Sequence, residues 1–171
     1  MKALTIWQPW ASLIVAGAKP FEFRGWKAPR SLIGQRIVIH AGAKLIDRKE
    51  ACDLYHVLLN RDVCDELKLA AAETCLRPEI ALPIIGRAWM PCREKLPLSA
   101  GLGTAIVGEP RSGIDIAEEF GVPRANDSDR DDKANWGWPM LDVEIWPEPI
   151  PMRGAQGLWN WPTPEQFAGE L

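Results

Sequence analysis

The chain has 171 residues, of which 47% are apolar and 25% are charged, and its formal net charge is −3. That length predicts a single domain, residues 1–171, whose core is large enough to form without a disulfide or a metal. The negative net charge argues against a broad basic surface that would grip duplex phosphates. The sequence shows neither a signal peptide nor a long apolar run, so we expect no membrane segment, a cytoplasmic location and reduced cysteines.

The first quarter of the chain predicts a strand, a helix and two further strands. The apolar run Ala3 to Ile6 is typical of a strand, and Gln8-Pro9-Trp10 opens a helix with proline in its first turn. Gly17 suits the position just beyond that helix, and a strand from about Pro20 to Trp26 follows. The strongest strand pattern is the β-branched run from Arg36 to Ala41.

The middle of the chain predicts a mainly helical insertion at about 45–101. Asp47, with Glu50 three positions later, is typical of a helix N-terminus with a capping box. A second helix is expected from about Asp62 to Glu73. The stretch from Arg77 to Gly101 is interrupted by prolines and predicts no regular element.

The last third of the chain returns to strands. One strand is expected from Gly103 to Arg111, and a short helix from Ile114 to Phe120. Trp136 to Trp146 is expected as a strand whose three tryptophans share one face, and Glu148 to Arg153 as a separate strand. Thr163 suits the cap of a final short helix.

Three charged side chains gather where the first helix ends and the next strand begins. In an extended segment Glu22 and Arg24 share one side while two phenylalanines share the other, which predicts a half-buried strand with a charged face. Lys19 lies just before that strand. The cluster is either a surface ion-pair network that ties the strand down or a ligand-binding site.

A second compact motif, Gly154-Ala155-Gln156-Gly157-Leu158-Trp159, lies near the end of the chain. Its two glycines allow a close backbone approach or a positive φ angle. The nine tryptophans serve either as core or as stacking surfaces for a planar base. Cys52 and His56 share a helical face without a second pair of ligands, so we expect neither a metal nor another cofactor.

The order of these motifs resembles the ASCH domain (activating signal cointegrator homology), a branch of the PUA-like superfamily. The similarity covers Met1 to about Ala41 and Gly103 to about Trp161, where Gly-x-Lys-x-x-Glu-x-Arg precedes Gly-x-Gln-Gly-Leu-Trp. It implies an α+β fold: a small PUA-like mixed β-barrel with flanking helices, here with a helical insertion. It also implies a cleft at the lysine motif, in which Lys19, Glu22 and Arg24 occupy the signature positions.

Family resemblance also implies a range of activities. Members bind RNA or single nucleotides, some are reported as ribonucleases, and a small bacterial branch is similar to amidohydrolases that deacetylate N4-acetylcytidine. That branch has a nucleophilic threonine where this chain has Glu22, and a carboxylate nucleophile would give an anhydride instead. Ribonuclease members rely on a lysine, a tyrosine and a serine; Lys19 fits, but Tyr55 lies in the insertion and Ser112 is a weak candidate.

The first functional hypothesis is a binding module for single-stranded RNA, a nucleotide or a modified nucleoside. A base would stack on Trp26 or Trp159 and be read by Gln156. Lys19 and Arg24 would meet a phosphate or carbonyl oxygen, with Glu22 lining the same cleft.

Two alternatives stay open. A hydrolase would use Lys19 as a base and Glu22 to orient water or to transfer protons, although Glu22 beside Lys19 also favours the charged ammonium. A protein-interaction module would dock a partner on the insertion, although no protein partner is evident in the sequence. We expect Lys19→Ala to leave the fold nearly intact but to remove ligand binding or activity, whereas a large loss of thermal stability would favour a structural role.

Overall fold

The computed structural model describes residues 1–59, 64–90, 95–126 and 136–162. Its strands are β1 (Lys2–Ile6), β2 (Phe21–Arg24), β3 (Arg36–Ala41), β4 (Ala100–Val107), β5 (Arg111–Ser112), β6 (Trp136–Pro151) and β7 (Leu158–Asn160). Its helices are α1 (Trp10–Val15), α2 (Arg48–Leu58), α3 (Asp65–Glu73), α4 (Pro78–Trp89) and α5 (Gly113–Phe120), with a short 3-10 turn, η1 (Arg30–Leu32).

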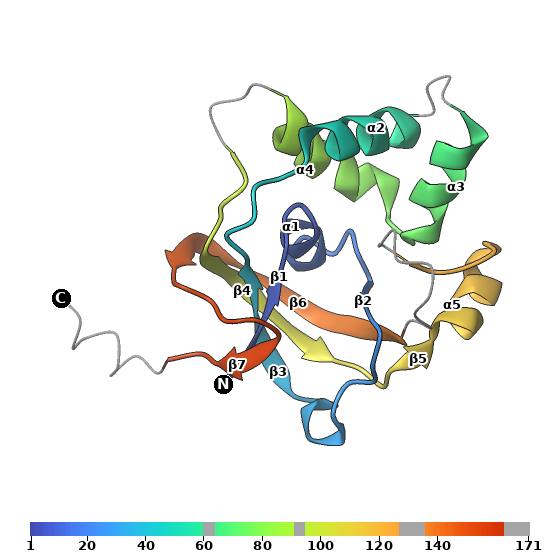
Figure 1. Ribbon diagram of the computed structural model, residues 1–171. Helices are drawn as coiled ribbons and strands as arrows, with labels where there is room; N and C mark the ends of the chain where they lie inside the picture. Colours follow the sequence, from blue (N-terminus) through green and yellow to red (C-terminus); the bar gives the residue numbers. More distant parts are fainter. Residues whose placement is uncertain (60–63, 91–94, 127–135, 163–171) are drawn as a thin grey trace.

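The described strands form one mixed sheet in the order β2-β6-β4-β3-β1-β7, with β5 paired to β6. β1 and β3 run parallel, and each of the other strand pairs is antiparallel. The sheet curves into a half-barrel, with α1 in its mouth and the other helices outside (Figure 1). This is the α+β barrel with flanking helices that the sequence predicted.

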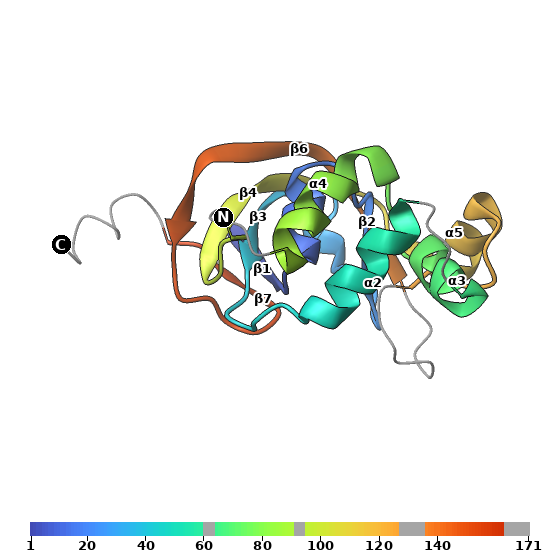
Figure 2. The same cartoon turned by 90° about the horizontal axis from the view of Figure 1, so that it is seen from above.

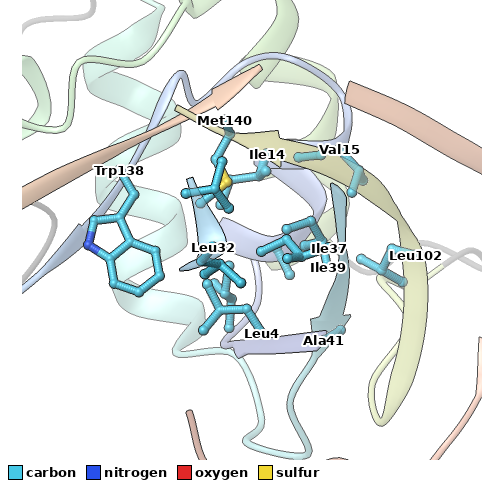
Figure 3. Packing of buried hydrophobic residues seen from close by; sticks show 14 of the residues in the cluster. Leu4, Ile14, Val15, Leu32, Ile37, Ile39, Ala41, Leu102, Trp138 and Met140 are labelled. Atoms are coloured by element: carbon cyan, nitrogen blue, oxygen red, sulfur yellow. The ribbon is translucent and has the colours of Figure 1, made fainter. Parts of the chain in front are cut away.

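The core lies between the concave side of the sheet and α1. Ile14 and Val15 of α1 point toward Leu4, Ile37 and Ile39 of the central strands, all of them buried (Figure 3). The helix is short and apolar on the side facing the sheet, so burial of that side stabilises it more than its own propensity does. It ends where predicted, because Gly17 adopts a φ of +75° directly beyond it.

Helices α2, α3 and α4 form a layer on one side of the half-barrel. This layer lies above α1 in Figure 1 and toward the viewer in Figure 2, which shows the molecule from above. The predicted cap is confirmed, because the Asp47 side chain accepts hydrogen bonds from the backbone of Lys49 and Glu50. Helix α4 was not predicted. Pro78 stands in its first turn, where no N–H partner is needed, and its apolar side packs on α2 despite the interior Pro83.

Strand β6 differs from the prediction in two ways. It is one strand of 16 residues, where two were expected. Leu141 pairs with Ile106 and Glu144 with Thr104, so two residues of β6 lie opposite one residue of β4, and Asp142 at this bulge has a φ of +44°. One extra residue reverses which side chains face inward, so Trp138 packs in the central core whereas Trp146 packs on the outer side. The prediction that the three tryptophans of this strand share one face is therefore wrong.

Two predictions fall partly or wholly outside the described residues: the helix expected from Thr163, and the start of the second helix at Asp62, which is observed from Asp65 onward. None of the described helices is long and apolar enough to cross a membrane.

Candidate functional site

Lys19 is held inside the protein by the turn that follows α1. The backbone N–H groups of Ala18 and Lys19 both donate to the carbonyl of Leu13, which turns the chain back under the helix. The Lys19 residue is only 1% exposed. Its Nζ donates to the Phe21 carbonyl and lies 3.3 Å from Glu22 Oε2. The ammonium is therefore fixed by two oxygen partners before any ligand is considered.

Glu22 joins Lys19 to Arg24, and these three residues are called the charged triad below. Glu22 Oε1 lies 2.9 Å from Arg24 Nη2, while Oε2 contacts the lysine. The same Arg24 Nη2 donates to the Thr5 carbonyl at 3.2 Å, which ties β2 to β1. The triad contains two cations and one carboxylate, and that carboxylate pairs with both cations.

The prediction of a half-buried strand with a charged outer face is wrong. Glu22 is 4% exposed, and the neighbouring Phe21 and Phe23 are also buried, packed on α5. Both faces of β2 are covered: its phenylalanines share a hydrophobic cluster with residues of α5, and Glu22 pairs with Lys19 and Arg24. The surface ion-pair interpretation of the triad fails for the same reason.

Two aromatic rings lie close to the lysine ammonium. Lys19 Nζ is 5.9 Å from the Trp10 ring centroid and 5.1 Å from that of Phe23. Contacts of this kind stabilise a cation that has lost its water, which compensates for part of the cost of burial. The indole of Trp10 is consequently in contact with the charged motif on one side.

A cavity of about 450 Å³ lies beside Trp10, between it and helices α2 and α3; we call it the helical-layer cavity. Apolar side chains of α2 and α3 form its walls, and the buried polar residues Glu73, Thr74 and Asn126 lie among its lining. Glu73 is paired with Arg124 at 2.7 Å. The described residues of the lining are Trp10, Asp47, Lys49, Glu50, Asp53, Leu54, Val57, Leu67, Ala70, Ala71, Glu73, Thr74, Arg124 and Asn126.

Such a cavity has the size of a small-molecule site, and its described lining combines six apolar residues with eight polar or charged ones. Trp10 is its aromatic wall. Sequence reasoning placed Trp10 in the core and did not identify Glu73, Arg124 or Asn126, because these residues come from segments far apart in the chain. In the part of the chain that the structure describes, no cluster of histidine, cysteine or acidic side chains could hold a metal ion.

Thr5 connects the charged triad to the second motif. Its carbonyl accepts the hydrogen bond from Arg24, and its hydroxyl donates to the Ala155 carbonyl at 2.6 Å. The Trp159 indole N–H donates to the same hydroxyl at 3.0 Å. The two motifs, more than 100 residues apart, therefore meet at one threonine on β1.

His40 is a buried structural residue beneath the second motif. Its Nε2 donates to the Met152 carbonyl at 2.9 Å, and Nδ1 lies 3.2 Å from the Thr5 hydroxyl. Burial lowers the pKa of His40 from its ordinary value, although the hydrogen bond to Met152 acts in the opposite direction. A Cβ at Gly154 would lie 2.3 Å from His40 Cε1, so this position requires glycine.

The remaining predicted site residues are dispersed. Trp26 is 45% exposed and meets Trp138 edge to face at a centroid distance of 4.7 Å. Gln156 is exposed, and Trp159 packs against His40. Among the contacts of the described residues, neither Trp26 nor Gln156 touches the triad.

The two residues considered for a ribonuclease site have structural roles. Ser112 caps α5 through its hydroxyl. Tyr55 packs on Trp89 within the helical layer. Neither residue lines the helical-layer cavity, and the structure gives each of them a contact that explains its presence.

Comparison with known proteins gives one matching family and several similar folds. The family model described as ASCH domain matches residues 4–91, a range that includes the triad and α2 to α4 but ends before Gly103. The crystal structure of ASCH from Zymomonas mobilis superposes with a TM-score of 0.50 at 16% identity, covering 98% of this chain and 90% of that chain. At that identity the likeness shows the fold alone.

Two further crystal structures are of mutants of the Zymomonas mobilis protein, one with a serine replaced by alanine and one with a tyrosine replaced by phenylalanine. Each has a TM-score of 0.49 at 16% identity and covers 98% of this chain, with 92% and 94% of the mutant chains covered. No curated protein matches the sequence.

Proposed function

Because this chain belongs to the ASCH domain family, we propose that it binds a nucleobase, carried by a nucleotide, a modified nucleoside or a short single-stranded RNA, in the helical-layer cavity. The observation that carries this proposal is the position of Trp10. One indole forms a wall of the cavity and also lies 5.9 Å from the ammonium of the family's signature lysine. The signature motif and the cavity are thus parts of one site.

The cavity suits a single base better than a long strand. Its volume of about 450 Å³ is within the usual range for small ligands. An indole wall supports stacking of a planar ring, which contributes about 1–3 kcal/mol per base. The Thr74 hydroxyl donates to the Ala71 carbonyl and can still accept a hydrogen bond from the edge of a base, and Asn126 is a further polar residue of the lining.

In this proposal the triad has a supporting role. The Lys19 side chain is 0% exposed and that of Glu22 is 6% exposed. We therefore propose that Glu22 fixes Lys19, and that Lys19 supports the Trp10 indole on the side away from the cavity. The Arg24 side chain is 24% exposed, the largest fraction in the triad, and like the other two members it lies outside the described lining of the cavity. Trp26, Gln156 and Trp159 remain proposed contacts for a longer RNA strand that extends beyond the cavity.

The hydrolase alternative has weaker support. A carboxylate oxygen 3.3 Å from Nζ favours the ammonium form of Lys19, and an ammonium cannot take a proton from a nucleophile. Binding without chemistry requires only the arrangement already described. Catalysis is nevertheless a measurable outcome of the experiment below.

We also propose that the helical layer and the half-barrel form one domain. Trp10 packs against the core of the half-barrel and against the cluster formed by α1, α2 and α4. We expect one cooperative unfolding transition, seen at the same denaturant concentration by tryptophan fluorescence and by far-ultraviolet circular dichroism.

The test is to fill the cavity and measure binding. Ala70 is an exposed residue of α3 that lines the cavity, and Ala72 is an exposed residue of the same helix that does not. Calorimetric titration would compare wild type, Ala70→Trp and Ala72→Trp against ribonucleosides, N4-acetylcytidine, their 5′-monophosphates and a short single-stranded RNA. We expect Ala70→Trp to abolish binding and Ala72→Trp to retain it. Equal binding by both variants, or no binding to wild type, would contradict the proposal.

Mass spectrometry of the same mixtures would detect chemistry. A new product formed by wild type and not by Lys19→Met would identify a hydrolase, and its mass would separate phosphodiester cleavage from deacylation. Unchanged ligands that bind in the titration would support the binding module.

A further inference from the structure

We infer that the ligand of the helical-layer cavity is a nucleoside without a phosphate group, an inference that rests on the proposed function and narrows its ligand class. The observation is the charge of the lining. Among the residues that the structure describes, the ionisable side chains that line the cavity are four carboxylates, Asp47, Glu50, Asp53 and Glu73, and two cations, Lys49 and Arg124.

Both cations of the lining are already paired. Lys49 Nζ lies 2.9 Å from Asp53 Oδ2 on the same helix. Arg124 Nε lies 2.7 Å from Glu73 Oε2, and that glutamate is buried. A phosphate would have to break one of these pairs, or share its cation with a carboxylate, to gain a charge-assisted hydrogen bond.

The N-terminus of α2 offers no replacement. Free N–H groups at a helix N-terminus commonly bind phosphate. Here the Asp47 carboxylate accepts hydrogen bonds from the backbone of Lys49 and Glu50, at 2.9 and 3.1 Å. A carboxylate therefore occupies the place where a phosphate would bind, and it lies in the lining of the same cavity.

An uncharged nucleoside meets none of these obstacles. Its base can stack on Trp10, and the side chains of Leu54 and Leu67 offer apolar surface for the ring and the sugar. The acidic lining would repel a monophosphate, which carries up to two negative charges, but not a neutral ring. The electrostatics of the described lining thus select against nucleotides.

The first measurement is the ratio of affinities between a nucleoside and its own 5′-monophosphate. Calorimetric titration at low salt would use the four ribonucleosides and N4-acetylcytidine, each paired with its monophosphate. We expect the monophosphate to bind at least about tenfold more weakly than the nucleoside. Raising the salt to about 0.5 M should narrow this ratio, because salt screens charges near the surface.

Asp53→Asn tests the electrostatic cause directly. It removes one carboxylate and releases Lys49, so the ratio of nucleoside affinity to monophosphate affinity should fall by about threefold to tenfold, whatever the change in nucleoside affinity itself. Asp65→Asn is the matched control. Asp65 also pairs with a lysine, Lys68, but neither residue lines the cavity, so both affinities should be unchanged.

The outcomes separate this inference from the function on which it rests. A monophosphate or a short RNA that binds as tightly as the nucleoside, or more tightly, would overturn the inference and leave the proposed function in place. An affinity ratio that neither salt nor Asp53→Asn changes would overturn it too. Failure of every nucleoside, nucleotide and RNA to bind would overturn both.

Discussion

Lys19 and Glu22 form an ion pair of 3.3 Å inside the protein, with side-chain exposures of 0% and 6%. Asp65 and Lys68 form an ion pair of the same length and the same sequence separation on the surface of α3, with exposures of 100% and 50%. The two pairs differ mainly in burial. Their comparison therefore measures how burial changes the energetic role of one kind of contact.

Replacing Lys19 by methionine should destabilise the protein by about 3–5 kcal/mol, because the buried carboxylate of Glu22 loses one of its partners. Replacing Lys68 by methionine should cost about 0–1 kcal/mol, since an exposed pair is screened by water. Chemical denaturation of both variants and wild type gives these values. The result expected from the sequence alone, a nearly intact fold without Lys19, would require similar small losses at both sites.

Trp10→Ala should lower the free energy of unfolding by about 3–5 kcal/mol, because the indole packs against two hydrophobic clusters. Trp26 is 45% exposed, and its replacement by alanine should cost about 1 kcal/mol. Both values come from urea or guanidinium titrations followed by circular dichroism. If Trp10→Ala were as stable as wild type, the indole could not be the packed wall that the proposed function requires.

Much of the fold was predictable because its signals are local. The Asp47 cap and Gly17 beyond α1 each act within a few residues and begin or end their helices as expected, and α5 ends at Phe120 as expected, where Gly121 follows with a φ of +65°. Helix α4 and the bulge at Asp142 were missed for the opposite reason. Packing against α2 stabilises a proline-containing helix, and pairing with β4 decides where β6 gains an extra residue.

The site was predictable only in part. The triad lies within six residues, so the sequence brings its charges together. Its burial was not predictable, because it depends on how the chain packs: Trp10 lies beside the Lys19 ammonium, and α5 covers the phenylalanines of β2. The cavity was missed altogether: Trp10, Glu73 and Asn126 meet only in the folded chain, and no spacing in the sequence indicates it.

The two glycines of the second motif should respond differently to substitution. Gly154→Ala would place a Cβ 2.3 Å from the His40 ring, and overpacking of this kind costs about 1–3 kcal/mol. Gly157→Ala meets no atom within 4 Å and is strained only by its φ of +71°, a cost of about 1–2 kcal/mol. Combining each change with His40→Ala distinguishes the causes in denaturation experiments. The free energy of unfolding lost on Gly154→Ala should become smaller when the imidazole is removed, whereas the free energy lost on Gly157→Ala should not change. Equal behaviour of the two glycines would contradict the close approach of Gly154 to the His40 ring.

His40 should make the protein less stable in mild acid. Because burial lowers the pKa of His40 in the folded state, the unfolded chain binds this proton more readily than the folded protein does. Its contribution to stability is therefore present above about pH 6.5, the ordinary value for histidine, and is lost as the pH falls through the lower folded value. The chain has two histidines, so nuclear magnetic resonance can follow both imidazole signals, and the signal missing from His40→Gln identifies His40. That signal should titrate below pH 6.5, and His40→Gln should flatten the decline of unfolding free energy between about pH 7 and pH 5. A His40 signal that titrates above 6.5 would mean that its hydrogen bond to the Met152 carbonyl outweighs burial.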